Sequence, residues 1–78
     1  MDILELSQDI SMVEMNVMPE WEGKPIAELG LRRKYSINIV AIRQGSEVLT
    51  IIDPEMVLDK SMKLIVIINS SSKILKQL

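Results

Sequence analysis

Apolar and polar residues alternate along several segments of the chain, and this alternation predicts β-strands. In the first such segment the side chains of Val13, Met15 and Val17 fall on one face, which is the period-two pattern of a half-buried strand. A tight turn around Gly45 predicts that the two segments flanking it pair as an antiparallel hairpin. The predicted strands span residues 11–18, 37–43, 47–52 and 62–68.

The connections between these strands carry the signals of short helices. Pro25 suits the first turn of a helix, because its missing N–H is not needed there. Ile26 and Leu29 then lie three residues apart on one face, and Gly30 is a natural stop. Further helical turns are predicted at residues 31–35, at residues 55–59, and after the serines at 70–72, where Ile74, Leu75 and Leu78 share an apolar face.

This order of elements predicts an α+β fold, a small two-layer sandwich with a mostly antiparallel sheet and short helices. Residues 11–78 would form the domain, and residues 1–10 would be a linker from a preceding domain that is absent from this chain. A short helix in residues 1–10 is an equal alternative. Both faces of the sheet are apolar while the helices are short, so we expect a second copy of the chain to cover part of this surface as a homodimer.

The composition of the chain limits the kinds of catalytic, metal and ligand sites that it can form. The 78 residues suffice for one small domain and contain neither Cys nor His. That excludes disulfides, the usual zinc ligands and Ser–His or Cys–His catalytic pairs, so we expect no enzyme, metal or resident cofactor. A formal net charge of -2 lacks the basic excess that nucleic-acid binding needs. The apolar runs are short and no signal peptide is visible, so we expect a cytoplasmic protein with no direct membrane insertion.

A resemblance to a known family rests on residues 23–43, which read GKPIAELGLRRKYSINIVAIR. They resemble the pattern G-K-x-I/L-x-E-L-x-L/I-R-x-K-Y-G-x-N-I/V-V/I-A-I-x-R of the TrkA C-terminal domain, also called the RCK C-terminal lobe. The resemblance covers roughly residues 11–78, and residues 2–7 look like the linker entering this domain in Ktr-type regulators. Ser36, Ser61 and Asn69 depart from the pattern at turns where glycine is usual.

The resemblance implies a cytosolic regulatory domain that gates a membrane potassium channel or transporter. In the family a nucleotide-binding Rossmann lobe precedes this one, so the chain is expected to be a fragment or a stand-alone lobe. In Ktr-type relatives these lobes pair, and cyclic di-AMP binds across the pair. The relatives' ligand motif falls on Ile26, Ala27, Arg32, Asn38, Ile39 and Val40, with Pro54 supplied from across the pair.

The residue types suit such a ligand. Arg32 offers a bidentate fork to a phosphate, and Asn38 can donate to and accept from a base edge or ribose. Ile26, Ile39 and Pro54 can sandwich flat purines. Gly30 stands where the family's motif has an aspartate, and if that acid orients Arg32, its loss predicts a looser site.

Other interpretations remain open from the sequence. The cations at positions 32–34 commonly form a solvated face at a helix end, and Asn38 can simply point outward from its strand. The domain can be a ligand-free oligomerisation module of a larger regulator. It can also be the same lobe attached to another transporter, such as a cation–proton antiporter or a dicarboxylate carrier.

Overall fold

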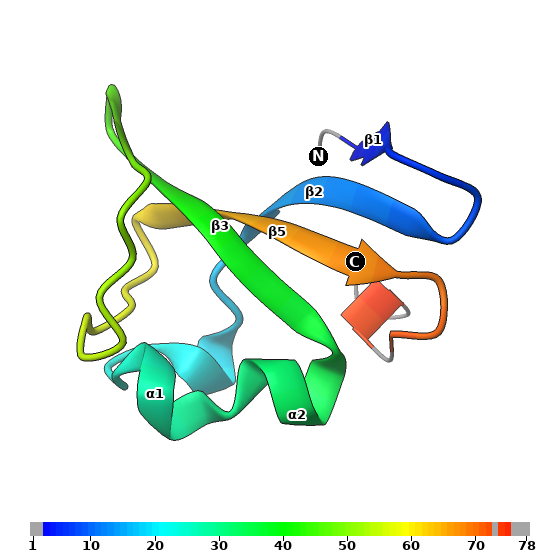
Figure 1. Cartoon of the computed structure of the whole chain (residues 1–78). Coiled ribbons are helices and arrows are strands. Elements are labelled where there is room, and N and C mark those ends of the chain that lie inside the picture. Colours follow the sequence, from blue (N-terminus) through cyan, green and yellow to red (C-terminus); the bar gives the residue numbers. More distant parts are fainter. Residues whose placement is uncertain (1–2, 73, 76–78) are drawn as a thin grey trace.

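In the part of the chain that the structure describes, residues 3–72 and 74–75 of a computed structural model, five antiparallel strands form one sheet (Figure 1). They are β1 (Ile3–Glu5), β2 (Ile10–Asn16), β3 (Ile37–Gln44), β4 (Glu47–Leu49) and β5 (Met62–Asn69). The order across the sheet is β1-β2-β5-β3-β4, with every neighbouring pair antiparallel. The predicted α+β fold is confirmed, and the dimer stays a prediction.

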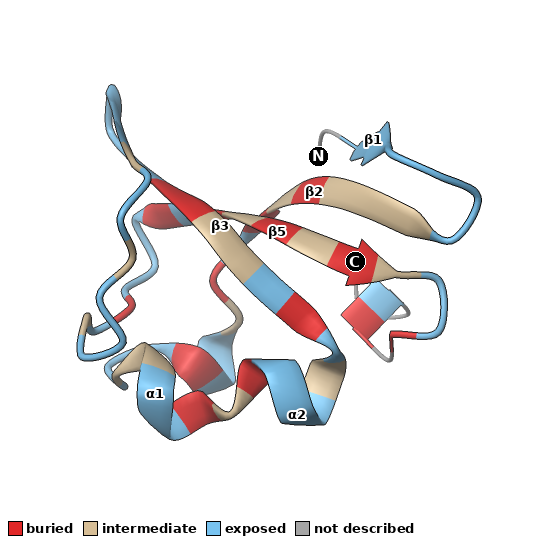
Figure 2. Ribbon diagram, in the orientation of Figure 1, coloured by how far each residue is buried: buried red, intermediate tan, exposed pale blue. Residues whose placement is uncertain are grey.

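The central strand β5 shows why the sheet has one strongly buried face. Leu64, Val66 and Ile68 are almost fully buried, whereas Ile65 and Ile67 between them are only half-buried. Because successive side chains of a strand point to opposite faces, the first set lies in the core and the second set on the other side. Strand β2 follows the same alternation, as its sequence pattern predicted, and Figure 2 shows the colours changing along both strands.

The helical layer lies against the buried face of the sheet (Figure 1). It contains η1 (Pro19–Trp21), α1 (Ile26–Leu29), α2 (Leu31–Tyr35) and a 3-10 turn at residues 74–75. Trp21 is buried, and its ring lies 5.6 Å from the ring of Tyr35 between centroids, tilted by 58°. Such a tilted aromatic pair stabilises the layer beyond the area it buries. The helical turn that the sequence predicted at residues 31–35 is present, as α2.

The end of the described chain is tied to α2 by a buried serine. The Ser72 hydroxyl donates a hydrogen bond to the Tyr35 carbonyl and accepts one from the Ile74 N–H at 3.3 Å. Ile74 is fully buried and joins the main core. Of the predicted C-terminal helix, residues 74–75 form the 3-10 turn, and residues 73 and 76–78, including Leu78, lie outside the described residues.

The N-terminal segment takes a conformation that neither sequence expectation contained. Residues 3–5 form β1, which pairs with β2 so that Ile3 lies opposite Val13 and Leu4 opposite Met12. A short apolar segment gains ladder hydrogen bonds at a sheet edge, whereas an isolated helix of this length is unstable in water. The division into a linker at residues 1–10 and a domain from residue 11 stays a prediction.

The segment after β4 also differs from its prediction. Strand β4 ends at Leu49 instead of residue 52. In place of the helical turn predicted at residues 55–59, residues 54–55 form a turn and Val57 makes an isolated antiparallel bridge with Pro25. The reason is that α1 uses this segment's carbonyls. The Ala27 N–H donates to the Pro54 carbonyl at 2.8 Å, and the Ile26 N–H donates to the Met56 carbonyl at 3.0 Å. These bonds hold the loop against α1, and that contact forms one wall of the candidate site.

Candidate ligand-binding cleft

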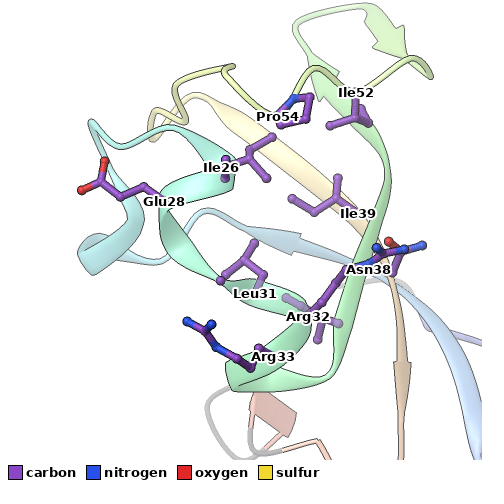
Figure 3. Close-up of a pocket in the computed structure, with 12 residues that line it drawn as sticks. Ile26, Glu28, Leu31, Arg32, Arg33, Asn38, Ile39, Ile52 and Pro54 are labelled. Atoms are coloured by element: carbon purple, nitrogen blue, oxygen red, sulfur yellow. The ribbon is translucent and has the colours of Figure 1, made fainter.

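A cleft of about 490 Å³ opens between the two helices α1 and α2, the start of β3 and the loop after β4 (Figure 3). Its volume is within the roughly 300–1,000 Å³ that is usual for small-molecule sites. The residues that line it are Ile26, Ala27, Glu28, Gly30, Leu31, Arg32, Arg33, Ile37, Asn38, Ile39, Ile52 and Pro54.

Gly30 makes the bend that gives the cleft its floor. It ends α1 and begins α2 with φ 59° and ψ 40°, in the left-handed region that glycine adopts without steric cost. The bend allows Leu29 before it and Leu31 after it both to be buried in the core. Arg32 and Arg33 then follow on the exposed side of α2, at the mouth of the cleft.

The apolar walls of the cleft face one another across three elements. Ile26 comes from α1, Ile39 from β3, and Ile52 and Pro54 from the loop after β4 (Figure 3). The three isoleucines are half-buried, so part of their apolar surface remains open to a ligand. Aliphatic side chains on opposite walls of a cleft can pack on the two faces of a flat ring such as a purine.

The polar groups of the cleft are mostly hydrogen-bond donors. Arg32 extends from α2 toward Asn38 on β3, and both side chains are exposed (Figure 3). In the described residues the one ion pair is Arg43 with Glu14, at 3.0 Å, so Arg32 has no carboxylate partner there. A guanidinium carries five donors in a planar fork, and the amide adds two donors and an acceptor. This arrangement can hold an anionic group next to a base edge or sugar.

Six of the seven residues proposed from the sequence line this one cleft: Ile26, Ala27, Arg32, Asn38, Ile39 and Pro54. The exception is Val40. The ladder of β3 and β5 pairs Ile39 with Val66 and Ala41 with Ile65, so an irregularity leaves Val40 outside the paired register. Pro54 borders the cleft of its own chain, and its expected role across a dimer is untested. The ligand-binding roles of all seven residues stay predictions.

Several lining residues were missed by sequence reasoning. Arg33 was interpreted only as part of a solvated basic cluster, and Ile52 as the end of a strand. Leu31, Ile37 and Glu28 were assigned to helix or core. The hydrophobic pattern marks the apolar ones as buried but does not tell which part of them borders an open space.

A second hollow lies on the other side of the sheet. It has a volume of about 230 Å³ and is lined by Ile3, Leu4, Met12, Glu14, Arg43 and Ile65. The Arg43 guanidinium donates to the Glu14 carboxylate from Nε at 3.1 Å and from Nη2 at 3.0 Å. With its charges already paired, this hollow offers a ligand fewer free polar groups than the first. In the described residues no helix is long and apolar enough to cross a membrane.

Solved structures of RCK domains resemble this chain. The RCK C domain of the potassium transport protein KtrA, solved in complex with cyclic di-AMP, superposes with a TM-score of 0.73 at 30% identity, covering 85% of this chain and 75% of that one. The GsuK RCK domain gives a TM-score of 0.75 at 32% identity over 92% of this chain and 16% of that one. The GsuK channel bound to NAD gives 0.75 at 31% identity, over 87% of this chain and 13% of that one.

Sequence comparison agrees with the structures. The Ktr system potassium uptake protein C of Bacillus subtilis (strain 168) is 45% identical over 49 residues, which are 63% of this chain and 22% of that protein. The chain thus spans about a fifth of the length of this relative. The family model of the TrkA-C domain matches residues 10–77. The resemblance found in residues 23–43 is confirmed, and the chain belongs to the TrkA-C domain family.

Proposed function

We propose that this chain is a regulatory domain of a potassium transport system, and that it binds a nucleotide such as cyclic di-AMP in the cleft as a homodimer. Its place would be at the cytoplasmic face of the membrane, through a channel or transporter partner. The proposal is supported by relatives that are named as potassium uptake and transport proteins, one of which is solved with cyclic di-AMP. Regulation of this kind is binding without catalysis.

The observation that carries the proposal is the meeting of the ligand-motif residues in one cleft. Arg32 would take a phosphate with its guanidinium fork, and Asn38 would bond a base edge or ribose. Ile26, Ile39 and Pro54 would hold the purine between them. These segments are separate in sequence, so their convergence in one cleft is a property of the fold and not of the motif alone.

An exposed apolar surface continues from the cleft and supports a dimer. Next to the cleft-lining Ile52, Ile51 is 91% exposed, and Val57 of the same loop is also exposed. Apolar groups gathered at the rim of a site are typical of a surface that a partner covers. A dinucleotide with two-fold symmetry matches a cleft shared by two copies. Binding would then change the equilibrium between two relative orientations of the pair, and so bias gating.

Isothermal titration with cyclic di-AMP tests this function. We expect saturable binding with one ligand per two chains, and we expect Arg32→Ala to weaken it by about tenfold or more because a charge-assisted hydrogen bond is lost. Arg43→Ala is the matched control, since Arg43 lies on the other side of the sheet, and it should bind as the parent does. NAD, the ligand named for the GsuK channel, belongs in the same titration series.

Different results of this titration would contradict different parts of the proposal. No heat with high micromolar cyclic di-AMP would remove the nucleotide while leaving the fold. Unchanged binding by Arg32→Ala would remove the residue assignment, and a stoichiometry of one ligand per chain would remove the shared cleft.

A second candidate is a ligand-free oligomerisation module. The observation that favours it is the half-buried apolar set Met12, Ile65 and Ile67 on the sheet face away from the helical layer. Such a module would dimerise but show no heat with any nucleotide in the same titration. A lobe that serves another transporter would behave as the leading proposal does, and its genomic neighbour would identify the partner.

A further inference from the structure

We propose that one wall of the cleft is a hinged arm, made of residues 23–29 and 54–58, which moves as one body and closes on a bound ligand. The closing step rests on the proposed function, because it takes the cleft to be the ligand site. The arm itself does not. It follows from the hydrogen bonds between its two segments, from the connections that attach it to the domain, and from the residues that it contributes to the cleft.

Backbone hydrogen bonds join the two segments of the arm into a short antiparallel ladder. The Gly23 N–H donates to the Leu58 carbonyl at 2.8 Å, and the Leu58 N–H donates to the Lys24 carbonyl at 3.1 Å. Pro25 and Val57 face each other between these bonds and those that the start of α1 makes with the same loop. The loop therefore runs beside the start of α1 (Figure 1), and neither segment can move without the other.

Two of the four connections to the arm come from neighbouring ends of the sheet and are held by turns. Asn16 at the end of β2 lies opposite Lys63 near the start of β5. The chain from β2 passes through η1, where Trp21 is buried. The chain into β5 turns at Asp59, whose carboxylate accepts a hydrogen bond from the Ser61 N–H at 2.8 Å. These two connections form a pivot at one end of the sheet.

The other two connections are able to yield. One is Gly30, which has no Cβ and joins α1 to α2, and hinges are often such residues at the ends of elements. The other is residues 50–52, which lie outside helix and strand. Among the described residues, no backbone hydrogen bond runs from the arm to α2 or β3. Leu29 and Leu58 hold the arm to the core by apolar packing, which permits small sliding movements.

The arm forms one side of the cleft and can change its width. It carries Ile26, Ala27, Glu28 and Pro54 of the lining, whereas the facing Ile39 lies on β3 (Figure 3). Rotation about the pivot brings the two walls together without changing the spacing within either wall. A flat ligand gains aliphatic contact on both faces when the arm closes, and this difference in contact shifts the equilibrium toward the closed position.

Closing the arm also moves an exposed apolar surface. Val57 belongs to the arm and is 50% exposed, and Ile51 lies in one of the yielding connections and is 91% exposed. In the proposed dimer the second copy would cover these residues. A closed arm therefore changes the surface that the two copies share, and this links the ligand state of the cleft to the orientation of the pair.

A disulfide across the ladder tests whether the arm is one body. The chain contains no cysteine, so Pro25→Cys together with Val57→Cys gives one defined pair. The two positions form a non-hydrogen-bonded antiparallel pair with Cα atoms about 4.5 Å apart, a spacing that a disulfide can bridge. Isothermal titration compares the oxidised and reduced forms of this variant. We expect their affinities for cyclic di-AMP to agree within about twofold, because the disulfide joins residues that move together.

Distances between nitroxide spin labels, measured by double electron–electron resonance, test whether the arm moves. Lys34→Cys with Glu55→Cys spans the cleft, and Lys34→Cys with Lys63→Cys is the matched reference, since Lys63 lies on β5. All three positions are exposed and none lines the cleft. An excess of unlabelled chain keeps each measured distance within one copy.

Without ligand, we expect the pair across the cleft to give a broader distance distribution than the reference pair. Cyclic di-AMP should narrow this distribution and shift its mean by about 2 Å or more, while the reference pair stays unchanged.

Each result decides the inference. An oxidised form that binds about tenfold more weakly than the reduced form means that the ladder must separate, and it overturns the single body. An unchanged distance across the cleft at saturating cyclic di-AMP overturns the closing step, and the proposed function then stands alone. If the chain binds no cyclic di-AMP, the proposed function fails and the distributions without ligand decide the arm: a broader pair across the cleft supports it, and equal widths overturn it.

Discussion

At the scale of single residues, three neighbouring cations meet three different surroundings. Each residue of an α-helix is rotated by about 100° from the one before it, so consecutive side chains cannot share a direction. Arg32 is directed toward Asn38, whereas the side chains of Arg33 and Lys34 both lie beside Gly30, and of these two only Arg33 lines the cleft. The sequence presents them as one basic cluster. Their different roles come from the short length of α2 and from the glycine before it.

A residue-scale prediction concerns Asp59, which is fully exposed. Its carboxylate accepts hydrogen bonds from the Ser61 hydroxyl and from the Ser61 N–H at 2.8 Å, and these bonds lower the pKa of Asp59 below its usual 3.8. The bonds favour the charged form, so their contribution to stability is present above the unfolded-state pKa and is lost as pH falls through the lower folded-state pKa.

We therefore expect Ser61→Ala to reduce the free energy of unfolding at about pH 7 and to have a smaller effect at an acidic pH, because the contribution is lost as pH falls through the lowered folded-state pKa. Urea unfolding at the two pH values measures this difference. Ser46→Ala is the control, since Ser46 is an exposed serine in a different turn, the one between β3 and β4. A loss of the same size at both pH values would show that the hydroxyl acts without Asp59.

At the scale of elements, the junction between α2 and β3 carries backbone strain. Ser36 has φ 58°, a left-handed conformation that costs a residue with a Cβ roughly 1–2 kcal/mol. It is held there because its N–H bonds the carbonyls of the last turn of α2, with 3.1 Å to the Arg32 oxygen. The bond ends the helix and directs the chain into β3, which places Asn38 and Ile39 at the cleft.

Ser36→Gly should relieve this strain. We expect the free energy of unfolding to rise by about 0.5–1 kcal/mol, because the relief exceeds the extra freedom that glycine gives the unfolded chain. Chemical denaturation of the parent and the variant measures it. Ser46→Gly is the matched control: Ser46 has no positive φ, so the same substitution should destabilise slightly or not at all. A loss of stability on Ser36→Gly would contradict the role assigned to this turn.

The elements also show how far sequence reasoning reaches. The strands at residues 11–18, 37–43 and 62–68, and the helix from Ile26 to its stop at Gly30, follow from periodicity and from turn residues, and the structure has them within a few residues. The strand at residues 3–5 was not predicted, because its stability comes from pairing with β2 instead of its own pattern. The helical turn predicted at residues 55–59 was wrong because the carbonyls of Pro54 and Met56 bond α1, a contact that local sequence does not encode.

The residues of the candidate site, too, could be predicted from the sequence only in part. Of the six ligand-motif residues that converge, five lie on the two short helices and the start of β3, which the sequence places correctly, and Pro54 comes from the loop after β4. Val40 does not line the cleft: it follows Ile39 on β3, where successive side chains point to opposite faces, and the register of β3 and β5 also shifts between Ile39 and Ala41. A β-bulge depends on the pairing of two strands, so the alternation of one strand does not reveal it. Arg33 was missed because its direction depends on the bend at Gly30.

At the scale of the whole molecule, the sheet is a platform that holds three distant segments around one cleft. Residues 26–33, 37–39 and 52–54 meet there, while the core beneath them joins β2, β3 and β5 to the helical layer. Side chains positioned on such a core keep their spacing within each wall of the cleft without a ligand, which lowers the ordering cost of binding. Ile51 and Val57, in the loop that borders the site, are exposed apolar residues, and in the proposed dimer the second copy would cover them.

The most direct test of the cleft as a nucleotide site is a two-dimensional nitrogen-15 NMR titration of the chain with cyclic di-AMP. The account predicts that the amides which shift most belong to residues 26–33, 37–39 and 51–56, including Arg32, Arg33 and Asn38. The amides around Glu14 and Arg43, on the other side of the sheet, should stay unchanged. Shifts confined to that other side, or none at a saturating ligand concentration, would contradict it.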